Sequence, residues 1–170
     1  MRRPPRRRHG RERHHLRHRL RRRRTVSKRK ILVRPVKISR TLLAQIHRHL
    51  EAGYPQEACG VMLGRDGVVT EIVPAENQRT DSAHNRYLID PLAYLKIERD
   101  ADRRGWQVLG IYHSHPDVAA RPSQFDLDHA LPCFSYLIVS VCRGKAVDTQ
   151  SWRLRDDRTQ FDHEPVDILD

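Results

Sequence analysis

Hydrophobic residues recur with two different spacings along the chain, and each spacing predicts one type of element. Apolar runs of about four to eight residues, and runs in which apolar and polar residues alternate, are typical of strands. Such runs occur at residues 31–39, 60–64, 68–73, 106–112, 136–141 and 147–154. Apolar residues three or four positions apart predict two main helices, one after Ser39 and one between Asp90 and Arg104. A short third helix is expected to begin near Ser123.

Residues at the ends of these segments support their boundaries. Ser39 can cap the first helix, which Gly53 ends. Pro91 suits the first turn of the second helix. Residues 65–67 (Arg-Asp-Gly) predict a hairpin turn between the second and third strands. Pro35 favours an edge position for the first strand, because proline cannot donate a hydrogen bond to a neighbouring strand.

The mixture of strands and helices indicates an α+β fold. We expect a central, mixed and curved β-sheet flanked by about two main helices. The chain length of 170 residues suits one domain with or without an unfolded extension. The elements begin at Ile31, so the expected domain spans residues 31–170 and follows a separate segment of residues 1–30.

The segment of residues 1–30 differs from the rest in charge. It holds 16 of the 33 Lys and Arg residues and one acid, Glu12, which gives +15 and leaves −3 for residues 31–170. Because it has almost no apolar side chains to offset chain entropy, it is predicted to be a disordered basic tail. Its charge suits non-specific binding to nucleic acid or another polyanion. A solvated tail without that role, or an artefact of an upstream start codon, are the alternatives.

The cysteines and the apolar runs bear on the compartment. Cys59, Cys133 and Cys142 are an odd number without framework spacing, so they are interpreted as reduced thiols. No apolar run is long enough to span a membrane. No apolar stretch follows the N-terminal arginines, which argues against a secretory signal. A cytoplasmic location is therefore the expectation.

The candidate chemistry lies in residues 110–130, which read GIYHSHPDVAARPSQFDLDHA. His113 and His115 are two apart at the end of an apolar strand, so both imidazoles can face one metal ion. Ser123 and Asp126 are three apart at the start of a helix, which brings them onto one face.

Two neutral imidazoles and a carboxylate, with a fourth position left to water, are typical of a catalytic zinc site. Other interpretations remain open at this point. Ser123 and Asp126 also form a plain helix-capping pattern, and His113 can be a buried core histidine. Asp128 and His129 compete as ligands, although on this helix only Asp126 shares a face with Ser123.

The segment from His113 to Asp126 resembles the signature of the JAMM metallopeptidases, the catalytically competent MPN domains. That signature is a glutamate upstream of H-x-H-x7-S-x2-D, and Glu57 is its best match here. The resemblance covers about residues 33–155 and implies the MPN architecture, which is similar to cytidine deaminases. Because the chain has no room for the insertions of the larger eukaryotic members, it is similar to the compact, stand-alone bacterial type.

The resemblance implies a role for each signature residue. His113, His115 and Asp126 would bind one zinc ion per chain. Glu57 would act as the general base, which takes a proton from water and passes it to the leaving amine. Ser123 would donate a hydrogen bond to the developing oxyanion.

The resemblance also implies the substrate, an amide bond after the C-terminal glycines of a small ubiquitin-like or sulfur-carrier protein. One alternative is a non-catalytic MPN-type interaction scaffold, which the complete ligand set disfavours. A second is a peptidase tethered to nucleic acid by residues 1–30. A third is thiol catalysis by Cys59, which its apolar neighbours Val61 and Leu63 disfavour.

Overall fold

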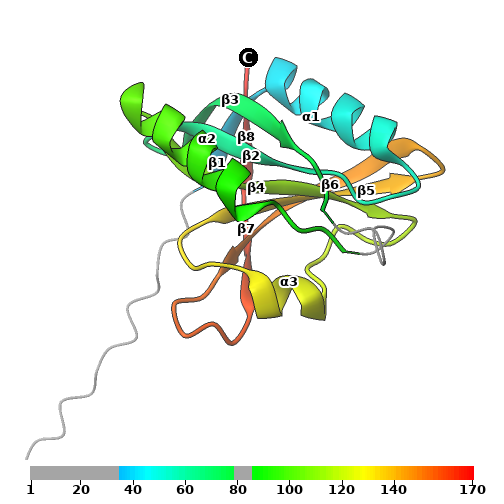
Figure 1. The fold of residues 1–170 in the computed structure, drawn as a ribbon. Coiled ribbons are helices and arrows are strands. Elements are labelled where there is room, and N and C mark those ends of the chain that lie inside the picture. The colour runs from blue at the N-terminus through cyan, green and yellow to red at the C-terminus, as the bar shows by residue number, and fades with distance from the viewer. Residues whose placement is uncertain (1–34, 79–85) are drawn as a thin grey trace, which may run out of the picture. The chain divides into compact units, whose positions relative to one another are not determined.

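The computed structural model describes residues 35–78 and 86–170 (Figure 1). The described residues form eight strands and three helices. In chain order these are β1 (Val36–Ser39), α1 (Arg40–Gly53), β2 (Cys59–Arg65), β3 (Val68–Ala75), α2 (Pro91–Arg103), β4 (Gln107–Pro116), α3 (Gln124–His129), β5 (Ser135–Cys142), β6 (Lys145–Leu154), β7 (Phe161–Glu164) and β8 (Val166–Leu169).

The eight strands form one mixed sheet in the order β7-β6-β5-β4-β2-β3-β1-β8. β1 is parallel to β3 and to β8, β4 is parallel to β5, and the other pairs are antiparallel. β7 and β8 lie at opposite ends of this order, although only Pro165 separates them in the chain. The sheet must therefore curl until its two ends meet, and the Val36 amide donates to the Pro165 carbonyl at 3.1 Å. The predicted α+β fold with a curved, mixed sheet is confirmed.

The two faces of the sheet bury separate groups of apolar side chains because neighbouring residues of a strand point to opposite faces. Tyr112 of β4 belongs to the core cluster that includes Ile46 and Leu50 of α1. Ile111, one residue earlier, belongs to the second cluster, which includes Ala101 of α2 and Ala130 after α3. The two clusters therefore place α1 against one face of the sheet and α2 with the end of α3 against the other.

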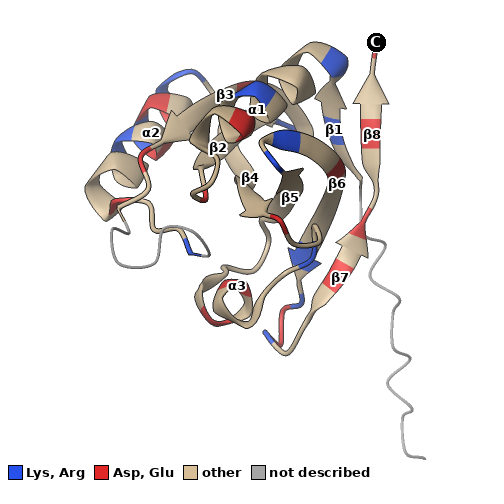
Figure 2. Cartoon of the chain, turned by 90° about the vertical axis from the view of Figure 1, so that its right-hand side faces the viewer, with Lys and Arg blue, Asp and Glu red and all other residues tan. Residues whose placement is uncertain are grey.

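The helix boundaries follow the predicted capping residues. The Ser39 hydroxyl accepts a hydrogen bond from the Leu42 amide at 3.2 Å, and the Asp90 carboxylate accepts one from the Ala93 amide at 3.0 Å. Pro91 occupies the first turn of α2 as expected. Figure 2 shows both signs of charge on α1 and α2 and acidic residues on β7 and β8.

One expectation about the strands requires correction. The edge position predicted from Pro35 is wrong, because β1 is hydrogen-bonded to β3 on one side and β8 on the other. Pro35 lies just before β1, so its missing N–H removes nothing from the ladder. The predicted hairpin turn is confirmed, with Asp66 and Gly67 at φ values of 53° and 77°. The sequence did not reveal β7 and β8.

Some predictions concern residues outside the described ranges. These are the disordered tail of residues 1–30, the first four residues of the predicted strand 31–39, and part of the polar loop of residues 75–86. The described residues belong to a compact unit, Leu32–Asp170. None of the described helices is long and apolar enough to cross a membrane.

Candidate functional site

Strand β4 places two histidines side by side at the site. It lies between β2 and β5, and it continues as a regular strand through His113 and His115 to Pro116. The two Nε2 atoms are 3.2 Å apart, as the alternation of a strand predicts. Both side chains are buried, with His113 fully inaccessible and His115 4% exposed.

The N-terminus of α3 brings Asp126 against both histidines. Asp126 Oδ1 lies 3.3 Å from His113 Nε2, and Oδ2 lies 3.5 Å from His115 Nε2. Its position is fixed by a capping box with Ser123. The Ser123 amide and hydroxyl donate to Oδ2 at 2.7 and 2.6 Å, and the Asp126 amide donates to Ser123 Oγ at 3.1 Å. Ser123 and Asp126 therefore form a helix cap, and the same Asp126 carboxylate lies beside both histidines.

Glu57 approaches the same site from the connection between α1 and β2. Its side chain is 6% exposed, and Oε1 lies 3.9 Å from His115 Nε2. The backbone next to it is held by Ser114, whose hydroxyl accepts from the Ala58 amide at 3.0 Å and whose amide donates to the Ala58 carbonyl at 3.0 Å. The Asn77 amide group donates to the Glu57 carbonyl at 2.9 Å. The structure thus brings all five predicted site residues into one region.

Burial and mutual charge set the protonation of the site. Burial, reinforced by the Asp126 charge, raises the pKa of Glu57 to about 8, although His115 partly opposes the shift. Burial also disfavours an ionised Asp126, but His113, His115 and Ser123 outweigh it and hold its pKa well below the usual range. Burial lowers the pKa of His113. An ionised Asp126 beside a neutral His113 is the protonation that a cation needs.

The distances fit a zinc ion. One ligand atom from each of His113, His115 and Asp126 lies within 4.8 Å of the others. Tetrahedral ligands with bonds of about 2.0–2.1 Å lie about 3.3–3.4 Å apart, close to the 3.2, 3.3 and 3.5 Å observed. His115 Nδ1 is 3.1 Å from the Ala119 carbonyl, and this bond leaves Nε2 free to bind a metal. His113 Nδ1 has no hydrogen-bond partner among the described residues.

The competing candidates lie outside this arrangement. The Cys59 side chain is buried, and burial raises the pKa of its thiol to about 12, which disfavours the thiolate that catalysis needs. Asp128 accepts a hydrogen bond from the Gln124 side chain at 2.8 Å. His129 is exposed, and its Nδ1 lies 2.8 Å from the Phe125 carbonyl. Neither Asp128 nor His129 belongs to the three-residue ligand group.

Two neighbours of the site escaped the sequence analysis. Tyr87 packs its ring on the His113 imidazole, with centroids 4.5 Å apart and planes 31° apart. The Asn77 side chain donates to the Arg86 carbonyl at 3.0 Å and accepts from the Leu88 amide at 3.1 Å. Asn77 therefore fastens the segment that carries Tyr87 to the backbone of Glu57. Both residues lie in or beside a polar loop, where no periodicity indicates which side chains face inward.

Comparisons with known proteins agree with this geometry. The family model of prokaryotic homologues of the JAB domain matches residues 39–155. The probable TtuB-protein conjugate cleaving protease of Thermus thermophilus is 38% identical over 101 residues, which cover 59% of this chain and 67% of the relative. The CysO-cysteine peptidase of Mycobacterium tuberculosis is 29% identical over 125 residues, which cover 72% and 83% of the two chains.

A solved structure also resembles the chain. The solution structure of a protein from Salinibacter ruber has 37% sequence identity and a TM-score of 0.62, and the match covers 79% of this chain and 92% of that one. The family model spans more than half of the chain and includes His113, His115, Ser123 and Asp126 as well as Glu57. The chain therefore belongs to the family of prokaryotic homologues of the JAB domain, and it is a peptidase in which His113, His115 and Asp126 are suited to bind a metal ion.

Proposed function

We propose that the enzyme hydrolyses the amide bond after the C-terminal glycines of a small ubiquitin-like or sulfur-carrier protein. One relative is named for cleaving a protein conjugate, and another is named as a peptidase of a CysO-cysteine substrate. The observation that carries the proposal is the convergence of three ligand atoms within 4.8 Å, with a separate buried carboxylate, Glu57, beside them.

In this proposal His113, His115 and Asp126 hold one zinc ion per chain. Zinc, when bound, supplies a Lewis acid that lowers the pKa of water to near 7 and polarises a carbonyl. The protein supplies the shape of the site: β4 fixes the two imidazoles, and the capping box of α3 fixes the carboxylate. Because these ligands lie on regular elements, little ordering is needed when the metal binds.

Glu57 acts as the general base and then as the general acid. Its carboxylate takes a proton from the attacking water and delivers it to the leaving amine. Burial raises the pKa of Glu57 to about 8, and the positive charge of a bound cation would lower this pKa, which makes the carboxylate form available to accept the proton. Its oxygen lies 3.9 Å from His115 Nε2, beyond the spacing of the three ligands, which suits a residue that acts on water.

Ser123 has two roles in this proposal. As the N-cap of α3 it orients Asp126 through the bonds described above. Its hydroxyl proton points to Asp126 Oδ2 at 2.6 Å, and rotation about Cα–Cβ or Cβ–Oγ redirects the proton to an oxyanion. A hydrogen bond of this kind contributes about 2.7–4 kcal/mol to transition-state stabilisation in other enzymes.

The function is tested on a defined conjugate. The full chain loaded with zinc is incubated with a ubiquitin-like protein whose C-terminal Gly-Gly is joined to cysteine or to a lysine side chain, and the products are weighed by mass spectrometry. We expect release of the protein with a free Gly-Gly terminus. Intact conjugates after prolonged incubation with zinc-loaded enzyme would favour the alternative of a non-catalytic scaffold.

We infer that the charge of +15 on residues 1–30 gives this segment non-specific affinity for polyanions and that the enzyme works in the cytoplasm. Polyanion binding by residues 1–30 would involve none of the proposed zinc-site residues. It would add a tether to nucleic acid without using the same residues.

A further inference from the structure

Glu57 lies outside the regular elements that hold the three proposed metal ligands. Strand β4 carries the two histidines, and the first turn of α3 carries the aspartate. Glu57 instead lies in the connection of residues 54–58 between α1 and β2. A strand or helix fixes its own backbone through regular hydrogen bonds, whereas an irregular segment takes its shape from bonds to its neighbours. The placement of the Glu57 carboxylate therefore depends on those neighbours.

Asn77 lies opposite Glu57 just beyond the end of a strand pair. The antiparallel pairing of β2 with β3 ends where Cys59 faces Ala75. Continuing this register by two residues on each chain sets Glu57 against Asn77. Neither residue belongs to a strand, so the main chains no longer pair here. A side chain makes the link instead, because the Asn77 amide group donates to the Glu57 carbonyl at 2.9 Å.

The same side chain holds the segment that leads into α2. The Asn77 amide group also donates to the Arg86 carbonyl at 3.0 Å, and its oxygen accepts from the Leu88 amide at 3.1 Å. A neutral carboxamide can serve two carbonyls and one N–H at once, whereas an ionised carboxylate has no proton to donate. Asn77 therefore links the main chain of Glu57 to that of residues 86–88.

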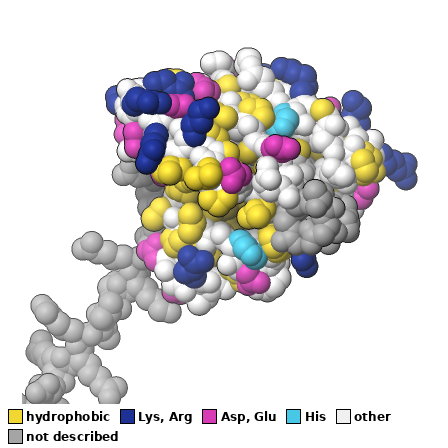
Figure 3. Space-filling view, viewed as in Figure 1, with side chains coloured by type: hydrophobic (Ala, Val, Ile, Leu, Met, Phe, Trp, Pro, Cys, Tyr) yellow, Lys and Arg dark blue, Asp and Glu magenta, His cyan; other side chains and the backbone are white. Residues whose placement is uncertain are grey.

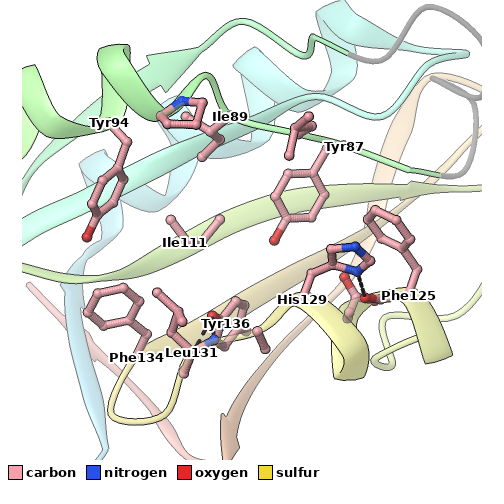
Figure 4. Close-up of a pocket in the computed structure, with 13 residues that line it drawn as sticks. Tyr87, Ile89, Tyr94, Ile111, Phe125, His129, Leu131, Phe134 and Tyr136 are labelled. Carbon is pink, nitrogen blue, oxygen red and sulfur yellow. Dashed lines mark hydrogen bonds between the residues drawn. The ribbon is translucent and has the colours of Figure 1, made fainter.

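The segment of residues 86–88 is in turn braced against the site. The Tyr87 ring packs on the His113 imidazole with centroids 4.5 Å apart. Figure 4 shows Tyr87 projecting from this segment into a hollow of about 260 Å³, whose wall also includes Asp126. The hollow lies on the face where Figure 3 shows hydrophobic side chains gathered. Asn77 thus ties Glu57 to a segment that already contacts a metal ligand.

One peptide unit next to Glu57 is held at both ends. The carbonyl of Glu57 accepts from Asn77, and the amide of the same unit, that of Ala58, donates to the Ser114 hydroxyl at 3.0 Å. A peptide unit is planar, so two bonds at its opposite ends fix the orientation of the plane. This plane sets the direction in which the Glu57 side chain leaves the backbone.

We propose that Asn77 is a positioning residue of the reaction, which acts through Glu57 by fixing the peptide unit that follows it. The inference rests on the proposed function, in which the Glu57 carboxylate moves the proton. Without the Asn77 amide, this unit can turn about its bond to Ser114, and the carboxylate shifts relative to the attacking water. A misplacement of about 1 Å can cost on the order of 100-fold in rate.

Asn77→Ala tests the inference on the zinc-loaded full chain with the Gly-Gly conjugate as substrate. We expect kcat to fall about 10–100-fold, KM to stay within about twofold, and zinc to remain at about one per chain. The matched control is Gln78→Ala, which removes the neighbouring carboxamide. The main-chain amide of Gln78 keeps its 2.9 Å bond to the Leu88 carbonyl, so kcat should not change.

Asn77→Asp keeps the size of the side chain and its acceptor for the Leu88 amide, but it loses both donors. This variant decides the matter if Asn77→Ala does not fold, and we expect the same fall in kcat with zinc retained. Unchanged kcat in Asn77→Asp, or a loss that appears only in KM, would overturn the inference while the proposed function stands.

A double variant shows whether Asn77 acts through Glu57. In a Glu57→Gln background, Asn77→Ala should lower the residual kcat by no more than about twofold, because the group that it positions no longer acts. A residue that only stabilises the fold would lower kcat by the same factor in both backgrounds, and that result would overturn the inference. Absence of hydrolysis by the unaltered enzyme would instead overturn the proposed function on which the inference rests.

Discussion

The two imidazoles of the site are held differently. His115 Nδ1 is hydrogen-bonded to the Ala119 carbonyl, whereas the His113 ring is held by packing against Tyr87. Both present Nε2 toward Asp126. The protein itself therefore fixes the orientation of each ring, by a hydrogen bond in one case and by packing in the other, as the proposed zinc site requires.

We predict that His115→Ala loses both zinc and activity, because two ligands on this scaffold cannot hold the ion as three do. Zinc per chain, measured by mass spectrometry after dialysis, should fall from about one to near zero. His163→Ala is the matched control. This histidine of β7 is exposed, its ring is hydrogen-bonded to Gln150, and it does not belong to the group of His113, His115 and Asp126. A His115→Ala protein that keeps its zinc would remove His115 from the ligand set.

Ser123→Ala should separate capping from catalysis. Loss of the cap should cost about 1 kcal/mol of stability, and loss of the oxyanion donor should lower kcat by about 100–1000-fold. Zinc should remain bound. Ser39→Ala removes the equivalent cap of α1 and should cost similar stability with kcat unchanged. If kcat of the two variants falls by the same small factor, Ser123 is only a cap.

The mutual placement of the proposed ligand residues could be predicted from the sequence because each relation is local. Two residues apart on a strand and three apart on a helix fix which side chains share a face. Tyr87 and Asn77 could not be predicted, because their contacts depend on how a loop returns to the sheet. The hollow beside Asp126 was missed for the same reason, since its wall combines residues 87–94, Ile111 and residues 125–136.

The last two strands hold the ends of the sheet together. Glu164 of β7 is fully buried, accepts from the Ser151 hydroxyl at 2.6 Å, and pairs with Arg153, whose Nε lies 2.8 Å away. The guanidinium of Arg153 also donates to the Cys133 carbonyl at 2.8 Å and the Ser135 hydroxyl at 3.0 Å. This network fastens β7 to β6 and to the start of β5.

Arg153→Met should therefore destabilise the protein strongly, because it leaves the Glu164 carboxylate buried without its partner. The expected loss in the free energy of unfolding is about 3–5 kcal/mol, measured by urea titration. The control is Arg155→Met, which breaks the more exposed pair with Asp162 and should cost about 1 kcal/mol or less. Equal losses in the free energy of unfolding of the two variants would mean that the buried network stabilises the protein no more than the exposed ion pair does.

β7 and β8 escaped prediction for physical reasons. Each has only four residues; FDHE of β7 contains a single apolar residue, and VDIL of β8 is apolar but too short for a clear strand pattern. Their pairing depends on β6 and β1, which are distant in sequence from one another. The edge position expected for β1 failed for the same reason, because the partner on its second side is β8.

At the scale of the whole molecule, residues 1–30 should be dispensable for the peptidase. The unit Leu32–Asp170 contains the sheet, both core clusters and every proposed site residue. Deleting residues 1–30 should leave the thermal unfolding midpoint, zinc content and peptide hydrolysis unchanged. Salt-sensitive binding to RNA should disappear with sixteen basic side chains. An unfolded truncated protein would show that the domain begins earlier.

The central claim is that three residues hold the metal while a fourth, Glu57, moves the proton. The most direct test is to measure zinc content and turnover together on Glu57→Gln, in which the side chain keeps its size and loses its basicity. We predict about one zinc per chain and a fall in kcat of at least about 100-fold. Loss of zinc from this variant, or turnover close to that of the unaltered enzyme, would contradict the account.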